Sequence, residues 1–408
     1  MDKNVIVGQS GGPTAAINAS LAGVYTAARA AGAPRVLGMR YGAEGLLRGE
    51  LVDLDQALAA PSALELLRRT PSSFLGSCRY KLPDPAQDEA PYRTILARLE
   101  ENNVGAFFYI GGNDSMDTIA KLSRYGAAVG SPIRFVGVPK TIDNDLCLTD
   151  HTPGYGSAAK YIAASLSEVL CDATVYNIPS VTVVEIMGRN AGWLAGAACL
   201  ADDGTGRGPD LILLPEADFD EAAFLARLKK LLAVKPGLVV AISEGIHTAD
   251  GVLLCEQAPG GAQQDAFGHR AFLSGAGGLL AGLIHEKLGC KARAVELSLL
   301  QRCASHLASA ADLAEAEAAG RAAVKAADAG DTGVMIAFAR AMQDGAYRCD
   351  TVAVPVSRVA NEVRAVPREW ITPDGMQVTQ QFRDYALPLI QGEVDAVWKN
   401  GVPQHISL

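Results

Sequence analysis

The sequence VGAFFYIGGNDS at residues 104–115 joins a continuous apolar run to a turn of two glycines followed by polar side chains. Residues 104–110 are rich in β-branched and aromatic side chains, which is typical of a strand covered on both faces in a parallel sheet. A second such strand is predicted at residues 135–138, directly before the polar segment Pro139 to Asp145. Because functional side chains gather at the carboxyl ends of parallel strands, the two segments predict a shared site.

Strand-like and helix-like segments alternate on both sides of this stretch. Strands are predicted at residues 4–7, 181–186, 210–214 and 238–242, and helices at 14–31, 116–125, 191–201 and 221–233. Repeated strand–helix–strand units indicate a doubly wound α/β fold. A chain of 408 residues exceeds what one hydrophobic core usually supports, so we expect two lobes.

The carboxyl-terminal quarter of the chain has a different composition. Residues 302–329 are rich in alanine with interspersed charges, which favours long surface helices. Residues 341–408 hold several prolines and little periodicity, so we expect a mixed extension that wraps one lobe.

Composition and charge exclude several classes of protein. The hydrophobic fraction is 49% and the formal net charge is −9, which disfavours nucleic acid and anionic membrane surfaces as partners. The sequence contains no run of 18 apolar residues and no secretory signal, so we expect a cytoplasmic protein. Its eight cysteines form no Cys-x-x-Cys pair, so free thiols are expected rather than disulfides or a zinc site.

The first glycine-rich turn, residues 8–13, joins a predicted strand to a predicted helix. Its backbone N–H groups can meet an anionic phosphate without side-chain clash, and the following helix end favours negative charge. The turn lacks the Lys-Ser/Thr pair of a Walker loop and the spacing of a dinucleotide fingerprint. A structural turn and a phosphate site are therefore equally compatible with this motif alone.

The second glycine turn places Gly111 and Gly112 where a backbone can approach a ligand, while Ser115 is expected to cap a helix that begins at Met116. Asp114 then lies at a helix end that attracts phosphate. A carboxylate there also serves simply to favour the helix dipole, so this segment alone leaves both interpretations open. The lysine and two aspartates of residues 139–145, after another buried strand, favour a phosphoryl-transfer site.

Four ordered segments together resemble the phosphofructokinase family. They are Gly111 to Ser115, Pro139 to Asp145, Met187 to Trp193 and Ser243 to Gly245, and the resemblance extends to about residue 302. It implies two doubly wound, Rossmann-like lobes with mostly parallel sheets. The implied donor lobe comprises residues 1–152 with about 301–355, and the implied sugar-phosphate lobe comprises 153–300 with about 356–408.

Within the family the chain looks like the pyrophosphate-dependent branch. ATP-using relatives typically carry glycine at the positions of Asp114 and Lys140, whereas pyrophosphate-using relatives carry this Asp and Lys. An aspartate where the α-phosphate of a nucleotide would lie excludes it by bulk and charge. Lys140 would provide positive charge for the transferring phosphate, and Gly11 and Gly12 would bind the diphosphate.

The resemblance implies the remaining roles at the site. Asp143 matches the family's catalytic base, which takes the proton of the sugar 1-hydroxyl, and Asp145 either positions Mg²⁺ or braces the loop. The expected activity is reversible phosphate transfer from diphosphate to fructose 6-phosphate, in glycolysis or gluconeogenesis. The residues expected to bind the sugar phosphate are Thr141, Ile142, Asp143, Met187, Gly188, Arg189, Glu244, Arg293 and Arg302. In this family one phosphate-binding arginine, best matched by Arg293, often reaches across from a neighbouring subunit. A homo-oligomer, most simply a homodimer, is therefore implied.

Three positions depart from the family pattern. Asn113, the implied Mg²⁺ ligand, replaces an aspartate that is common in the family. Leu299 replaces an aromatic residue or a histidine, and Ser180 lies near a position where ATP-using relatives often carry an arginine. The first weakens attraction for the cation, and together the changes leave room for another ketose phosphate, such as sedoheptulose 7-phosphate.

Three other functions are alternatives to this one. ATP dependence is the main alternative among kinases. A catalytically silent regulatory subunit is disfavoured because Asp143 and Lys140 are retained, and a nicotinamide-dependent dehydrogenase because the dinucleotide fingerprint is absent.

Overall fold

The apolar run at residues 104–110 forms the centre of a seven-stranded sheet in the computed structural model, which describes residues 1–257, 275–344 and 346–408. The strand order is β11-β10-β5-β4-β1-β2-β3. Strands β10, β5, β4, β1 and β2 are parallel to their neighbours within this group, while β3 and β11 are antiparallel at the two edges. The bounds are β1 Asn4–Gln9, β2 Val36–Met39, β3 Leu51–Asp53, β4 Val104–Gly111, β5 Arg134–Pro139, β10 Val334–Gln343 and β11 Ala346–Pro355.

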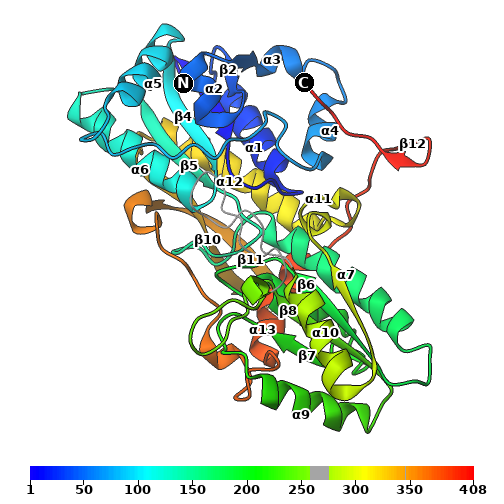
Figure 1. The fold of residues 1–408 in the computed structure, drawn as a ribbon. Helices are drawn as coiled ribbons and strands as arrows, with labels where there is room; N and C mark the ends of the chain where they lie inside the picture. Colours follow the sequence, from blue (N-terminus) through cyan, green and yellow to red (C-terminus); the bar gives the residue numbers. More distant parts are fainter. Residues whose placement is uncertain (258–274, 345) are drawn as a thin grey trace.

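A second sheet has four strands in the order β7-β8-β6-β9, all parallel. Their bounds are β6 Ser180–Ile186, β7 Leu211–Leu213, β8 Gly237–Ser243 and β9 Lys291–Glu296. In Figure 1 the first sheet lies in the upper lobe and the second sheet in the lower lobe, and β10 and β11 of the first sheet extend toward the lower lobe. The mixed α/β architecture with mostly parallel sheets confirms the predicted fold class.

Helices cover both sheets (Figure 1). The α-helices are α1 Ile17–Ala30, α2 Gly42–Arg48, α3 Leu54–Ala57, α4 Ala63–Arg69, α5 Ala90–Glu101, α6 Asn113–Ala128, α7 Tyr155–Ala173, α8 Trp193–Gly196, α9 Glu221–Leu232, α10 Ala276–Leu288, α11 Leu300–Cys303, α12 Ala310–Asp328 and α13 Gln380–Ala386. The 3-10 helices are η1 Ala197–Ala201, η2 Leu254–Gln257, η3 Ser305–Leu307, η4 Val356–Arg358, η5 Arg368–Trp370 and η6 Leu387–Ile390, and a small ribbon joins β12 Trp398–Lys399 to β13 Val402–Pro403.

Strand β4 is buried on both faces, as its composition predicted. Phe108 and Ile110 pack into one core with α1 and α12, and Phe107 and Tyr109 pack into another with α5 and α6. Successive side chains of a strand point to opposite faces, so a continuous apolar run is the expected sequence for such a strand.

Two predicted helices differ from the structure. The predicted helix at residues 191–201 is a single turn, α8, followed by the 3-10 helix η1. The alanine-rich stretch forms α12, but this helix is only partly on the surface. Its buried face packs against α1, where a Cβ atom on Gly320 would lie 2.2 Å from the carbonyl oxygen of Ser20.

The tail is more regular than its composition suggested. Its first part forms the antiparallel pair β10 and β11, which extends the first sheet. Further on, Phe382, Tyr385 and Leu389 pack into the core around α7 and Trp193. The chain then returns to the first lobe, where the backbone N–H of Ile406 donates to Thr70 Oγ1 at 3.0 Å, so both termini lie at the same end of the molecule (Figure 1).

Two further expectations concern the whole chain. None of the helices in the described ranges is long and apolar enough to cross a membrane. All eight cysteines have free thiols, as predicted.

Candidate active site

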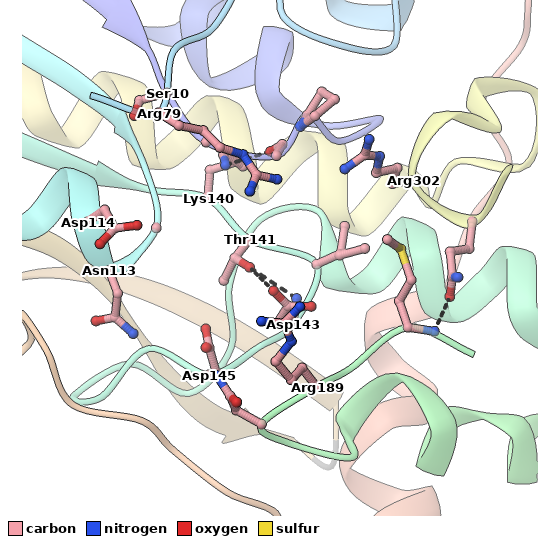
Figure 2. A pocket seen from close by; sticks show the side chains of 18 of the residues that line it. Ser10, Arg79, Asn113, Asp114, Lys140, Thr141, Asp143, Asp145, Arg189 and Arg302 are labelled. Atoms are coloured by element: carbon pink, nitrogen blue, oxygen red, sulfur yellow. Dashed lines mark hydrogen bonds between the residues drawn. The ribbon is translucent and has the colours of Figure 1, made fainter. Parts of the chain in front are cut away.

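The carboxyl ends of strands from both sheets border one cavity of about 860 Å³. From the first sheet come the turns after β1, β4 and β5, and from the second come the segments after β6 and β8. Of the predicted site residues, the cavity is lined by Gly11, Gly12, Asn113, Asp114, Lys140, Thr141, Ile142, Asp143, Met187, Arg189, Glu244 and Arg302. Figure 2 shows ten of the lining residues by name.

Lys140 lies at the floor of the cavity, with only 2% of its surface exposed. Its Nζ donates to the carbonyl oxygen of Gly12 at 2.7 Å, which fixes the ammonium beside the first glycine turn. A Cβ atom on Gly11 would lie 3.3 Å from this Nζ, and Gly11 has a φ of +75°, so glycine suits both the space and the conformation. Burial lowers the pKa of Lys140 to about 8, although the nearby Asp143 carboxylate opposes the shift.

Helix α6 begins earlier than predicted. Gly112 is its N-cap residue and Asn113 is its first residue, so Ser115 lies inside the first turn and does not cap the helix as expected. Ser115 instead packs against the glycine turn, where a Cβ atom on Gly111 would lie 1.8 Å from Ser115 Oγ. Asp114 lies in the first turn at the positive end of the helix, as predicted.

Asn113 is held by one end of its amide only. Its Nδ2 donates to the carbonyl oxygen of Glu362 at 2.9 Å. Its Oδ1 is buried and has no hydrogen-bond partner in the part of the chain that the structure describes. An orphaned buried oxygen on a residue that lines the cavity is a suitable ligand for a hard cation.

The loop after β5 orients Asp143 through Thr141. The backbone N–H of Asp143 donates to Thr141 Oγ1 at 3.1 Å, and this hydroxyl donates to Asp143 Oδ2 at 3.2 Å (Figure 2). Burial raises the pKa of Asp143, against the hydrogen bond from Thr141 and the charge of Lys140. Burial and the neighbouring Asp143 raise the pKa of Asp145 to about 7. The loop therefore carries two carboxyl groups with a raised affinity for a proton.

The second sheet provides a carboxylate and an arginine. Glu244 accepts from the backbone N–H of Gly188 at 3.2 Å, and burial raises the pKa of Glu244 to about 7. Arg189 lines the same wall of the cavity. Its backbone packs directly against Gly245, where a Cβ atom would lie 2.0 Å from the Arg189 carbonyl oxygen. Gly188 is not among the lining residues within the described ranges, but its N–H positions the Glu244 side chain.

Arg293 is the one predicted site residue that the fold places elsewhere. It lies on β9, where its guanidinium is 3.5 Å from the Asp172 carboxylate, and it lines a second cavity of about 420 Å³. Within a single chain it is separate from Lys140 and Asp143. Arg302, in contrast, lines the main cavity close to Gly12, where a Cβ atom would lie 3.4 Å from Nη1 of the arginine.

Sequence reasoning missed several lining residues. Arg79 and Lys81 bring positive charge from the loop before α5, and Arg79 lies close enough to lower the pKa of Lys140 (Figure 2). No predicted strand precedes this loop, so only the closely spaced basic residues of the sequence RYK signalled an anion site. Gln301 was also missed, although its Oε1 accepts from the backbone N–H of Met187 at 3.2 Å.

The arrangement separates two kinds of chemistry within one cavity. One end carries the glycine turns, Lys140 and Arg79, which suit a compact polyanion. The other end carries Glu244 and Arg189, which suit a hydroxylated, anionic acceptor. Asp143 lies between them, where a base could meet an acceptor hydroxyl.

Comparison with known proteins agrees with this geometry. A family model described as Phosphofructokinase matches residues 4–327. Two curated relatives are both named pyrophosphate–fructose 6-phosphate 1-phosphotransferase. The one from Xanthomonas campestris is 43% identical, covering 99% of this chain and 96% of the relative, and the one from Halomonas elongata is 40% identical over the same shares. The solved structure of a pyrophosphate-dependent phosphofructokinase from Nitrosospira multiformis superposes with a TM-score of 0.88 at 37% identity, covering 100% of this chain and 96% of that one.

Proposed function

The chain belongs to the phosphofructokinase family, and from that premise we propose that it transfers phosphate reversibly between diphosphate and the 1-hydroxyl of fructose 6-phosphate. The products are fructose 1,6-bisphosphate and phosphate, so the enzyme serves glycolysis or gluconeogenesis according to metabolite levels. The observation that carries the proposal is the presence of Asp114, Lys140 and Asp143 in one cavity.

Asp143 acts as the base. It accepts the proton of the sugar 1-hydroxyl while that oxygen forms a bond to the terminal phosphorus, and the bridging P–O bond breaks to release phosphate. Its hydrogen bonds with Thr141 aim the carboxylate, and its raised pKa brings the base closer to neutral pH. In the reverse direction the same carboxylic acid returns the proton.

Lys140 binds the diphosphate and stabilises its developing charge, together with the backbone of Gly11 and Gly12. Asp114 selects the donor, because its carboxylate occupies the space and repels the charge of a nucleotide α-phosphate. The remaining contacts to the sugar phosphate come from Thr141, Ile142, Met187, Gly188, Arg189, Glu244 and Arg302.

The cation required is Mg²⁺. The Oδ1 of Asn113, which has no hydrogen-bond partner among the described residues, and the carboxylate of Asp145 are oxygen ligands of the kind that Mg²⁺ prefers, so the residues present fit the ion. When bound, Mg²⁺ neutralises charge on the diphosphate oxygens. Asn113 is neutral, so phosphate oxygens and water would supply the remaining ligands of the bound ion.

The working form is a homodimer in the cytoplasm. Arg293 lines an open surface cavity with Leu300 and Asp172, which suits a subunit contact through which the arginine reaches the sugar phosphate of a neighbour. The lobes comprise residues 1–152 with about 301–355 for the donor, and 153–300 with about 356–408 for the sugar phosphate. The division is supported by the strands of the first sheet, which come from residues 4–139, 334–343 and 346–355, and by those of the second, which come from residues 180–296.

Leu299 favours a second candidate acceptor. It lines the cavity, is 54% exposed, and offers no hydrogen bond where relatives carry a histidine or aromatic residue. A longer ketose phosphate such as sedoheptulose 7-phosphate is therefore the alternative substrate. The ratio of kcat/KM for the two sugars distinguishes them.

The donor experiment compares diphosphate with ATP, each with Mg²⁺ and fructose 6-phosphate, on the wild type and on an Asp114→Gly, Lys140→Gly double variant. We expect activity with diphosphate alone, and its loss in the variant. Binding of fructose 6-phosphate to the variant is the control for folding. Wild-type activity with ATP alone would overturn the donor assignment, and no activity with either donor on either sugar would overturn the enzymatic function.

A further inference from the structure

A cluster of ionisable side chains lies outside the cavity, and its central member, His151, belongs to the same loop as Asp143. His151 is 1% exposed, and its Nε2 is 2.7 Å from Glu315 Oε2, while its Nδ1 is 2.8 Å from Asp150 Oδ2. Cys349 completes the group: its Sγ, a ring nitrogen of His151 and an oxygen of Glu315 all lie within 4.8 Å of one another. The proposed transfer reaction uses none of these side chains.

We propose that His151, Glu315 and Cys349 form a binding site for a Zn²⁺-like transition metal ion, with Nε2, a carboxylate oxygen and the thiolate as ligands. Imidazole, carboxylate and thiolate are the three side-chain ligands that Zn²⁺ accepts. They come from three elements that are far apart in sequence: the loop after β5, helix α12 and strand β11.

The surroundings of His151 match those of a metal-bound histidine. Such a ligand usually donates its other ring N–H to a carboxylate, which fixes the tautomer and strengthens the metal bond. Asp150 takes this position on Nδ1 and is itself held by Arg340, whose Nε is 3.0 Å from Asp150 Oδ1. The ring also stacks on Phe338 with centroids 4.7 Å apart, so its plane is fixed.

Charge balance favours the ion in this buried place. Without metal, the 2.7 Å contact between His151 Nε2 and Glu315 Oε2 requires one shared proton, and the Cys349 thiol carries another. A divalent ion that takes Nε2 and the sulfur of Cys349 releases two protons to solvent, so the net charge of the cluster is unchanged. The ion therefore adds no uncompensated charge to the interior.

The three ligand atoms already lie within 4.8 Å of one another, so binding an ion requires local adjustment of the side chains. Bonds of about 2.0–2.2 Å to nitrogen and oxygen in a tetrahedral site need the two atoms roughly 0.6 Å further apart than a hydrogen bond places them. Tyr347 supports the carboxylate by donating to Glu315 Oε1 at 2.8 Å. Cys349 is half-buried on β11, an edge strand of the sheet, so an ion can approach from solvent.

The test uses Co²⁺ as a spectroscopic probe on the full-length protein. We expect one Co²⁺ per chain to produce a thiolate-to-cobalt charge-transfer band, to be displaced by Zn²⁺, and to lose that band in Cys349→Ser. Cys171→Ser, which removes an exposed thiol on α7, is the matched control and should keep the band. A wild type without the band, or a band that survives in Cys349→Ser, would overturn the proposal.

A second measurement needs no variant. Zn²⁺ should slow alkylation of Cys349 at least about 10-fold, as mapped by mass spectrometry, and leave alkylation of Cys171 unchanged. Equal alkylation of Cys349 with and without Zn²⁺ would contradict the site even if the serine variant does not fold.

Discussion

At the scale of single residues, burial sets the proton affinities of the cavity. It lowers the pKa of Lys140 to about 8 and raises the pKa of Asp143, so both shifts favour the neutral form. The two side chains oppose these shifts in each other because their charges attract. The cavity therefore holds a lysine that can lose its charge just above neutral pH and a carboxylate with increased basicity.

The first prediction concerns pH and diphosphate binding. Lys140 is charged below its pKa and becomes neutral as the pH rises through about 8, so kcat/KM for diphosphate should fall above this pH. In Lys140→Arg the charge persists and this alkaline limb should move to higher pH. Initial rates from pH 6 to 10 in a constant-ionic-strength buffer measure it, and identical limbs in both proteins would contradict the role of Lys140.

The second prediction concerns the base. Asp143→Asn keeps the shape of the side chain but removes the proton acceptor, so kcat should fall roughly 100- to 10,000-fold. Binding of fructose 6-phosphate and the midpoint of thermal unfolding should change little, which calorimetry can check. Near-normal turnover in the variant would show that another group takes the proton.

At the scale of elements, the close crossing of α1 and α12 helps to position the first glycine turn, which leads into α1. Gly23 and Gly320 face each other's helices, and a Cβ atom on Gly23 would lie 2.1 Å from the Glu317 carbonyl oxygen. Because backbone atoms are in the way, a side chain at either position must push the helices apart.

The third prediction follows from this crossing. Gly320→Ala should lower the free energy of unfolding by about 1–3 kcal/mol, although alanine is the better helix former. Gly282→Ala on α10 is the matched control, because no neighbouring atom of the described residues lies within 4 Å of its Cβ position, and it should be neutral or stabilising by up to about 1 kcal/mol. Urea unfolding of both variants decides the matter, and equal effects would mean that the helices do not pack as closely as described.

At the scale of the whole molecule, the fold separates Arg293, a predicted substrate-binding residue, from the cavity of its own chain. The arginine lies on β9 beside a surface cavity, away from Asp143 of its own chain. If it serves the site of a neighbour, then function depends on the assembly and not only on the fold.

The fourth prediction tests this dependence by complementation. Arg293→Ala and Asp143→Asn should each be nearly inactive, but a mixture refolded together should regain activity. In a random equal mixture about half of the dimers are heterodimers. Each heterodimer has both defects in one site and an intact second site, so about a quarter of all sites recover. Proteins mixed without subunit exchange are the control, and no recovery after exchange would place Arg293 outside the neighbour's site.

The sequence by itself determined the fold class, because continuous apolar strands and glycine turns are local signals whose physical meaning does not depend on context. It also placed Asp114, Lys140 and Asp143 at strand ends, and parallel strands bring such ends together. The tertiary structure alone decided that Arg79 and Gln301 join the cavity and that residues 334–343 and 346–355 extend the first sheet. These features arise from contacts between segments far apart in the chain, and the packing of one segment against another leaves no periodic signal in either.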